Sequence, residues 1–588
     1  MKKLNRAIFG LSLGLILTTA NFAWANENPA KRERRAQEKV EIKVQAWGPA
    51  QAEIDAAKLR VTRSPAVQKV LAGTKYRIFA FEYIENDVDK SKPSTAPTRF
   101  RVIFYDYTND RTIVAEGDFA AKEAIVIREE SAQPNANDEE FEEAVRIVRS
   151  DARFAQLLRG EKLRVSQPMP PITVLDGTTE RLVNVALEPL DGSTRNEIVS
   201  VSINRGTVIR YDAGAPEMSR ATPDSCGPSS SNQGSTSNGT AGQYQLTVRQ
   251  GKSVLWEMLV IRPSASSGNS FERSGIEVRD VRYKGKSVLK RGHAPVLNVN
   301  YTPATGQQNC GPFRDWQYQE GFFNAPEAGA TDPAPGIRVL AAGQNATTQV
   351  DTGNDTGNFR GVAIYTQNVG FGDEIVMVSE MNAGWYRYIM EWRFAPDGTI
   401  RPRYGYGATL NSCVCTYHHH HTYWRFDFDI VNPTNKVFQV ERGRKFLQPV
   451  TNEIARLRST QTNRGYLIQN STGNEAYLLA PNVTDGEYLS RNTSGAVIST
   501  YGAGDFWLLK YQGTAGAPGE LDDPNSSSAA NLAPWVNNES LVNQDVVVWY
   551  AAHFMHTDGA NLLDPNRINP SLVTSSHVVG PDIRPVRW

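Results

Sequence analysis

One stretch of the chain constrains its fold and its chemistry more than any other. Four consecutive histidines, His418 to His421, run directly into a segment that alternates aromatic with charged side chains as far as Ile430. This alternation predicts a β-strand, in which neighbouring side chains point to opposite faces. Two imidazoles at positions i and i+2 of a strand suit a transition metal such as copper or zinc. Parity allows either pair, His418 with His420 or His419 with His421.

Further metal ligands must come from a short list. The chain has eight histidines, and those outside the run are His293, His553, His556 and His577. His553 and His556 follow the strand-like segment DVVVWY, which makes them the natural source of a third imidazole. Asp427 and Asp429 lie on the face of the first strand opposite His418 and His420, where two carboxylates suit a hard cation or an ion pair.

The first 25 residues have the pattern of a secretory signal. A basic start is followed by a short apolar core, Ile8 to Leu17, and by Ala23-Trp24-Ala25 at a typical cleavage site. The apolar core is too short to span a bilayer comfortably, and no later segment is a candidate span. The protein is therefore expected to be exported, either to a bacterial periplasm or as a secreted protein.

Charge and cysteine content limit the partners and cross-links. Lysine plus arginine equals aspartate plus glutamate, at 63 each, which gives no electrostatic reason to expect nucleic acid or a membrane surface as a partner. Four cysteines in an exported chain allow up to two disulfides. Cys226 with Cys310 is the expected pair, because Cys413 and Cys415 lie too close along a strand for an easy bond.

The chain divides into segments of different character, and its fold class is predicted to be mainly β. Helical spacing followed by strand-like runs occurs twice, which indicates two small α+β domains. A Ser/Gly-rich stretch indicates a flexible linker, and the strand-rich remainder indicates a large C-terminal β-sandwich. The predicted segments are signal peptide 1–25, α+β domains 26–120 and 121–222, linker 223–242 and β-sandwich 243–588.

Five features of the C-terminal region share their order and spacing with one enzyme family. They are Tyr301 fourteen residues before Asp315; Asp315 itself in FRDWQYQEG; Trp385-Tyr386-Arg387 ahead of Trp392 and Asp397-Gly398-Thr399-Ile400; His418 and His420 followed by Arg425, Asp427 and Asp429; and the segment from Asp545 to His556. On these features the region resembles the copper-containing amine oxidases, which build a topaquinone cofactor from one of their own tyrosines. The two small domains also look like the family's N-terminal domains.

The resemblance implies an activity and a set of site residues. The activity is copper- and topaquinone-dependent oxidative deamination of a small primary amine by O2, which yields an aldehyde, ammonia and hydrogen peroxide. His418, His420 and His556 would bind copper, and Tyr386 would be the quinone precursor. Asp315 would remove a proton from the substrate, a role that requires a buried setting and a raised pKa. Tyr301 would orient the quinone, and the family's usual state is a homodimer.

A second cation site is also implied by the resemblance. Asp427, Asp429 and Asp545 would supply carboxylates, while Phe428 and Val546 would offer backbone carbonyls. Ligation by oxygen alone suits calcium or manganese. The alternative is that these acids pair with Arg425 or simply end a strand.

Departures from the family pattern leave other functions open. Trp385 and Arg387 replace the usual asparagine and acid beside the quinone precursor, and a cation there would repel an ammonium substrate. Ala363 stands where a cysteine is expected. The main alternative is a copper-binding relative in which Tyr386 stays unmodified. A purely structural β-sandwich with a chance histidine run is the third hypothesis.

Several residues have a second interpretation. Glu320 is the alternative general base if Asp315 is an ordinary acid. His553 is more simply a packed or hydrogen-bonded histidine, but it replaces His556 if the alignment slips by three. His419 and His421 are interpreted as residues that support the metal ligands or lie on the surface.

Overall fold

The computed structural model describes most of the chain beyond its N-terminal segment. The described residues are 40–84, 92–130, 133–134, 136–168, 181–189, 197–210, 227–228, 241–266, 273–301, 313–411, 414, 418–443, 446–459, 461–482, 485, 504–512, 532, 535–556 and 575–588. The predicted signal peptide, all four cysteines and nearly all of the predicted linker lie outside these residues. The side chains of Tyr301 and His556 also lie outside them, although both backbones are described.

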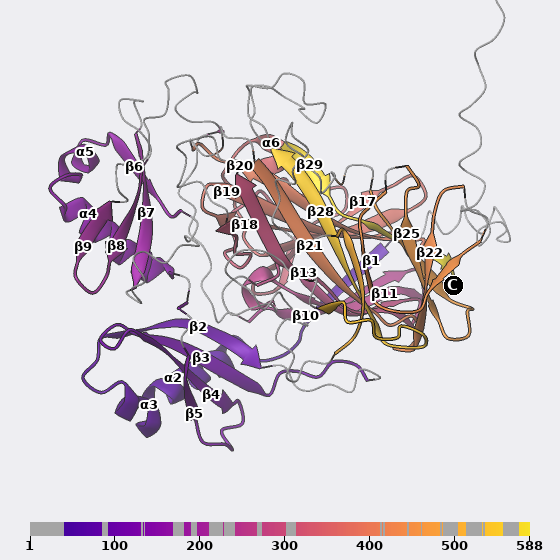
Figure 1. The fold of residues 1–588 in the computed structure, drawn as a ribbon, viewed down its shortest axis with the longest axis horizontal. Helices are drawn as coiled ribbons and strands as arrows, with labels where there is room; N and C mark the ends of the chain where they lie inside the picture. Colours follow the sequence, from indigo (N-terminus) through magenta and orange to yellow (C-terminus); the bar gives the residue numbers. More distant parts are fainter. Residues whose placement is uncertain are drawn as a thin grey trace, which may run out of the picture.

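Two large sheets form most of the molecule (Figure 1). Within the described residues the first has ten strands, in the order β1-β10-β11-β12-β13-β21-β28-β27-β24 with β14 beside β13. These strands are β1 Val40–Ala46, β10 Gln243–Gln250, β11 Ser253–Ile261, β12 Glu277–Tyr283, β13 Lys286–Tyr301, β14 Phe313–Arg314, β21 His418–Phe428, β24 Ile454–Arg456, β27 Phe506–Lys510 and β28 Val546–His556.

The second sheet has twelve strands among the described residues, in the order β15-β16-β17-β18-β19-β20-β30-β26-β25-β22-β23 with β29 beside β20. They are β15 Thr331–Ala334, β16 Ile337–Val339, β17 Val362–Asn368, β18 Asp373–Ala383, β19 Tyr386–Phe394, β20 Ile400–Ala408, β22 Asn435–Val440, β23 Gln448–Val450, β25 Gly465–Asn470, β26 Ala476–Ala480, β29 Ser575–Val579 and β30 Asp582–Arg587. The short helices η1 Pro263–Ala265 and α6 Gln349–Thr352 lie in connections.

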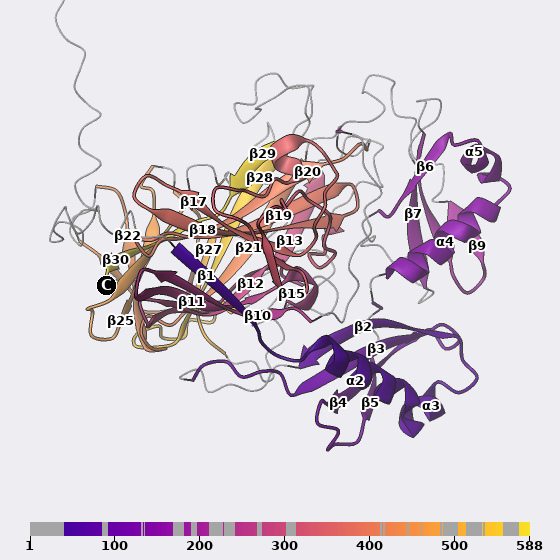
Figure 2. The same cartoon turned by 180° about the vertical axis from the view of Figure 1, so that it is seen from behind.

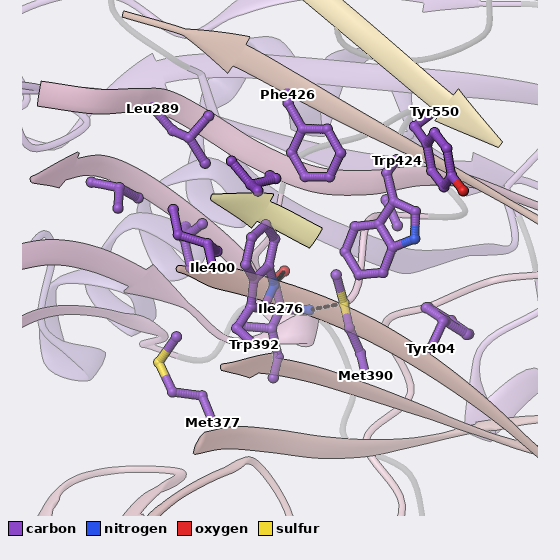
Figure 3. Close-up of a cluster of buried hydrophobic side chains, with 14 of the residues drawn as sticks. Ile276, Leu289, Met377, Met390, Trp392, Ile400, Tyr404, Trp424, Phe426 and Tyr550 are labelled. Atoms are coloured by element: carbon purple, nitrogen blue, oxygen red, sulfur yellow. Dashed lines mark hydrogen bonds between the residues drawn. The ribbon is translucent and has the colours of Figure 1, made fainter. Parts of the chain in front are cut away.

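The two sheets share one apolar core. Trp392 of β19 and Trp424 of β21 meet edge to face, with ring centroids 5.5 Å apart, and Figure 3 shows both among the side chains that fill this space. The indole nitrogen of Trp392 donates to the carbonyl of Ile276, 3.0 Å away, so its one polar group is satisfied inside the core. The predicted fold class, mainly β with a large C-terminal sandwich, is confirmed.

Two smaller sheets precede most of the sandwich. One contains β2 Tyr76–Ile84, β3 Arg99–Asp106, β4 Arg111–Asp118 and β5 Val126–Glu130, with helices α2 Gln51–Arg63 and α3 Pro65–Val70. The other contains β6 Leu163–Ser166, β7 Leu182–Pro189, β8 Glu197–Ser202 and β9 Thr207–Arg210, with helices α4 Asp138–Ser150 and α5 Ala155–Arg159. Among the described residues, no helix combines the length and the apolar character that a membrane crossing requires.

The N-terminal strand does not belong to the first small unit, where the predicted segment 26–120 would put it. β1 pairs antiparallel with β10 along its whole length, from Val40 opposite Gln250 to Ala46 opposite Tyr244. Figures 1 and 2 show β1 beside β10 in the large sandwich, away from β2 to β5. The reason is that β1 alternates one apolar with one polar residue, as an edge strand over a core requires.

The two small units pack against each other through a common apolar cluster. Tyr105 and Val114 of the first sheet share it with Val185 and Val201 of the second. A buried ion pair between Arg181 and Glu140, 2.6 Å apart, lies in the same contact, and its carboxylate also accepts from the Tyr107 hydroxyl at 2.7 Å. Buried charges of this kind need such complete pairing to be tolerated.

Strand β21 occupies the centre of the first sheet, between β13 and β28. All eleven of its residues are buried, so neither face of this part of the sheet meets solvent. In the register of the two ladders, His418 lies directly opposite Tyr301 of β13 and directly opposite His556 of β28. Three residues that are far apart in the chain therefore form one row across three strands.

Candidate active site

The histidine run begins at the first residue of β21. His418 and His420 are both fully buried, and their ring centroids lie 5.1 Å apart. Because positions directly opposite in an antiparallel ladder share a face of the sheet, Tyr301 and His556 belong to the same face as His418. The structure thus brings these four positions together, by backbone register for Tyr301 and His556.

Tyr386 approaches this row from the facing sheet. It is the first residue of β19 and is completely buried. Its hydroxyl is hydrogen-bonded to Nε2 of His418, and its ring centroid lies 4.4 Å from that of His420. The phenol of the proposed quinone precursor is therefore in contact with one histidine and packed on the other.

Asp315 is anchored on β13, at a point four residues before Tyr301. It directly follows β14, and its backbone N–H donates to the carbonyl of Leu297 in β13 at 2.9 Å. Burial raises the pKa of the Asp315 carboxyl to about 7, against the opposing effect of a hydrogen bond that Tyr388 donates to Oδ2. Among the described residues, Oδ1 of Asp315 has no hydrogen-bond partner. This oxygen is a buried proton acceptor with its capacity unused.

Tyr388 connects the two halves of the site, and sequence reasoning missed it. Its ring stacks parallel to that of Tyr386, at 5.6 Å between centroids and 4° between planes, while its hydroxyl donates to Asp315. Tyr406 lies opposite Tyr388 on β20 and stacks on His420 at 4.6 Å. The tyrosines at i and i+2 in YRY (386–388) and YGY (404–406) were the available signal, since they mark one face of two strands.

Glu320, the alternative base, is engaged elsewhere. Its carboxylate forms a buried ion pair with the guanidinium of Arg262, in which Nε of the arginine lies 2.8 Å from Oε1. The backbone N–H of Ser264 donates to the same oxygen at 3.1 Å. The oxygens of Glu320 are thus already engaged by Arg262 and Ser264, so the geometry favours Asp315.

The side chain of Arg387 points away from the ring of Tyr386. This corrects the expectation that its charge would repel a cationic substrate. Its guanidinium is buried in a two-pronged ion pair with Asp355, with nitrogen to oxygen distances of 2.6 and 2.9 Å. A further nitrogen donates to the carbonyl of Tyr386 at 3.0 Å. Strand alternation puts this charge on the opposite face from the tyrosine ring, and Asp355 neutralises it there.

The three acids of the expected cation site also meet. Carboxylate oxygens of Asp427, Asp429 and Asp545 all lie within 4.8 Å of one another. Phe428 and Val546, whose carbonyls the resemblance implies as further ligands, face each other in the ladder between β21 and β28. A side-chain nitrogen of Arg425 lies 3.9 Å from Asp427, so the ion pair named as the alternative also has geometric support.

The remaining histidines occupy the other face of β21. His419 and His421 are 5% and 1% exposed, so the interpretation that they lie on the surface is wrong. Burial lowers the pKa of His419 to about 4 and that of His421 well below its usual value, with His553 adding to both shifts. His553 lies opposite His421, three positions along the ladder from His418 and on the other face of the sheet, so it cannot replace His556 beside His418.

The residues present fit a copper ion and a tyrosine-derived quinone. Imidazole nitrogens on one buried pleat are good copper ligands, and His556 occupies the matching position on the next strand. The phenol of Tyr386 touches Nε2 of His418, a nitrogen suited to a metal, so an ion bound there would adjoin the tyrosine ring. The unused oxygen of Asp315 supplies the proton acceptor that amine chemistry would need.

The ion pair between Arg387 and Asp355 yields a prediction about stability. Arg387→Ala leaves the buried carboxylate of Asp355 without its arginine partner. The variant is expected to destabilise the protein by about 3–5 kcal/mol, seen as a lower midpoint in urea unfolding. The double variant Arg387→Met with Asp355→Leu replaces the pair by apolar groups and should recover most of this loss. Equal destabilisation of the single and double variants would show that Asp355 is not the group left unpaired.

Comparison with known proteins also points to the copper-containing amine oxidases. Residues 364–561 match the family model described as copper amine oxidase, enzyme domain. The crystal structure of a copper-containing benzylamine oxidase from Hansenula polymorpha aligns with a TM-score of 0.57 at 15% identity, over 90% of this chain and 96% of that one. An Aspergillus nidulans amine oxidase aligns with a TM-score of 0.55 at 13% identity, over 92% and 88%. A lysyl oxidase from Pichia pastoris aligns with a TM-score of 0.52 at 12% identity, over 92% and 90%.

No curated protein matches the sequence. The structural likenesses, at 12–15% identity, establish a common fold, and the family model connects the segment from β17 to beyond β28 with an enzyme domain. The resemblance of this chain to the copper-containing amine oxidases is therefore confirmed, through an enzyme-domain match over residues 364–561 and a fold shared with amine oxidases of known structure.

Proposed function

We propose that the protein is a primary amine oxidase that uses copper and a topaquinone made from Tyr386. One observation carries this proposal. The Tyr386 ring is held between two buried histidines on one side and, through Tyr388, a buried carboxyl with a pKa of about 7 on the other. The products would be an aldehyde, ammonia and hydrogen peroxide.

The residues of the chain divide the work among them. Bound copper and the quinone would supply the redox chemistry between the amine and O2. His418, His420 and His556 would hold the metal beside the Tyr386 ring. Tyr301, which lies directly opposite His418 in the ladder between β13 and β21, would orient that ring. Tyr386, His418 and His420 are completely buried, which excludes bulk water from the reacting centre.

Asp315 would take the proton from the carbon next to the substrate nitrogen. A base works best when its pKa lies near the working pH, and the value of about 7 meets this requirement. Tyr388 donates to Oδ2 and so fixes the carboxylate, which leaves Oδ1 to accept the proton. Because this hydrogen bond favours the charged form, it keeps the pKa from rising further.

The acids Asp427, Asp429 and Asp545 would bind calcium or manganese. The proposal is supported by three carboxylates whose oxygens lie within 4.8 Å, a concentration of negative charge that a hard divalent cation offsets. The site lies at the end of the ladder between β21 and β28, remote in register from His418. A role in stabilising that ladder follows from this position.

Export and assembly remain predictions from the sequence and the resemblance. The secretory pattern of residues 1–25 supports export to a periplasm or the outside of the cell. The family resemblance supports a homodimer. Arg387, paired with Asp355, gives no reason to exclude a cationic amine as substrate.

The first test is reconstitution. Protein purified without copper is given Cu(II) in air and titrated with phenylhydrazine, which forms a coloured adduct with quinones. We expect an adduct near one per chain, lost in Tyr386→Phe and retained in the matched control Tyr477→Phe, a buried tyrosine of β26. Bound copper without an adduct would reject the oxidase and leave the copper-binding relative as the function. Neither copper nor adduct would leave a structural sandwich.

A second test uses the pH dependence of turnover. The carboxylate form of Asp315 is the active one, so kcat/KM should rise with pH through a pKa near 7. Tyr388→Phe keeps the stacked ring but removes the hydrogen bond that lowers this pKa. The rise should therefore move to higher pH, by about one to two units. An unshifted profile would mean that Asp315 is not the titrating base.

A third test concerns the cation site. Protein stripped by a chelator should gain thermal stability when calcium or manganese is restored, by about 2.7 kcal/mol at a hundredfold excess over the dissociation constant. Asp429→Asn should abolish this gain, whereas Asp332→Asn, which alters an acid in a partly exposed ion pair with Arg338, should leave it intact. A gain that persists in Asp429→Asn would refute binding by these acids.

A further inference from the structure

The face of β21 turned away from Tyr386 carries histidines that the proposed oxidase chemistry does not use. His419 and His421 lie on this face at i and i+2, and His553 joins them from β28. All three are at least 95% buried. Further along the same face lie Tyr423, Trp507 and Trp549, which belong to one buried cluster.

The distances within this group are short. Nδ1 of His421 lies 2.7 Å from Nδ1 of His553, directly across the ladder. The ring of His419 is stacked on that of His421, with centroids 6.1 Å apart and planes 18° from parallel. Two imidazole nitrogens thus face each other, with a third imidazole beside them.

A carboxylate orients one of these rings. Nε2 of His553 lies 2.8 Å from Oδ1 of Asp505, and a carboxylate can only accept, so Nε2 carries the proton. In a neutral ring Nδ1 of His553 is then the unprotonated nitrogen, and it accepts from Nδ1 of His421. Metal-binding histidines characteristically donate their other N–H to a carboxylate in this way, which fixes the ring and increases its basicity.

We propose that His421 and His553, with His419 beside them, form a second transition-metal site, for copper or zinc, on the opposite face of β21 from His418 and His420. Asp505 is its positioning residue and is not itself a ligand. The site goes beyond the proposed oxidase function, since it needs neither a quinone nor an amine. It also differs from the oxygen cluster of Asp427, Asp429 and Asp545, because nitrogen ligands favour copper and zinc over calcium.

Only a small rearrangement is required for binding. Two nitrogens on one tetrahedral ion with bonds of about 2.0–2.1 Å lie roughly 3.4 Å apart. The rings must therefore separate by somewhat less than 1 Å from their hydrogen-bonded distance. The metal replaces the proton between the two nitrogens, and that proton moves to Nε2 of His421, which stays neutral. His419 remains the neighbouring imidazole, with its ring centroid 6.1 Å from that of His421.

Metal stoichiometry tests the proposal on the full chain. Wild-type protein free of transition metals, with calcium in excess to fill the oxygen cluster, is dialysed against Cu(II) or Zn(II), and bound metal is counted. The variants are His553→Gln, His421→Leu and Asp505→Asn. His420→Ala reports on the first site, and His293→Gln is the matched control, a buried histidine of β13 hydrogen-bonded to Ser274.

We expect wild type and His293→Gln to bind a second equivalent of metal that His553→Gln and His421→Leu lack. His420→Ala should lose the other equivalent, and Asp505→Asn should weaken the second one by about 10–100-fold. A single equivalent in wild type overturns the proposal, as does a second equivalent that survives in both His553→Gln and His421→Leu. The His421, His553 and Asp505 chain would then be a purely structural hydrogen-bond network.

Electron paramagnetic resonance of copper-loaded wild type decides the question if those variants fail to fold. Two Cu(II) signals, each with nitrogen couplings, are expected at full loading. A single signal at saturation overturns the second site without any substitution. Circular dichroism of each variant shows whether it is folded. The metal count decides if the variants fold, and the resonance spectrum of wild type decides if they do not.

Discussion

The ladder formed by β13, β21 and β28 is the constraint on which the site depends. Its backbone hydrogen bonds fix the register to the residue, so that Tyr301, His418 and His556 fall in one row. A slip of one position would move every histidine of β21 to the other face. Such a slip is costly here because both faces are buried, with aromatic residues on each. The same packing that stabilises the sheet therefore sets the positions of the histidines.

Burial of polar groups gives the site its chemistry. Within one region, Asp315 is buried with a single hydroxyl donor and has a pKa raised to about 7, whereas Glu320 and Asp355 are buried against arginines. The three carboxylates differ in partners more than in exposure. A buried acid without a cation becomes a proton acceptor near neutral pH, and a buried acid with one becomes a structural ion pair.

Much of the fold and the composition of the site could be predicted from the sequence, because local patterns carry them. Alternation identified β21, and the resemblance of its motifs to those of the copper-containing amine oxidases singled out Tyr386, Asp315 and the three acids. Partners distant in the chain could not be predicted in this way. Asp355 pairs with Arg387 from 32 residues away, and Asp505 meets His553 from 48 residues away. No local periodicity encodes such contacts, since they arise only when strands from different hairpins take their register.

The position of β1 has a consequence for how the sandwich is assembled. This strand closes the free edge of β10, yet about two hundred residues, including both small units, separate the two strands in the chain. The small units are thus an insertion into the sandwich, and the sandwich is discontinuous in sequence. A shortened chain that begins at Gln243 would lack β1. It would present the eight-residue edge of β10 with unpaired N–H and C=O groups, a template for pairing with other chains. During synthesis β1 stays unpaired until both small units and β10 have emerged. Folding of the small units shortens the distance between β1 and β10 that the chain has to close.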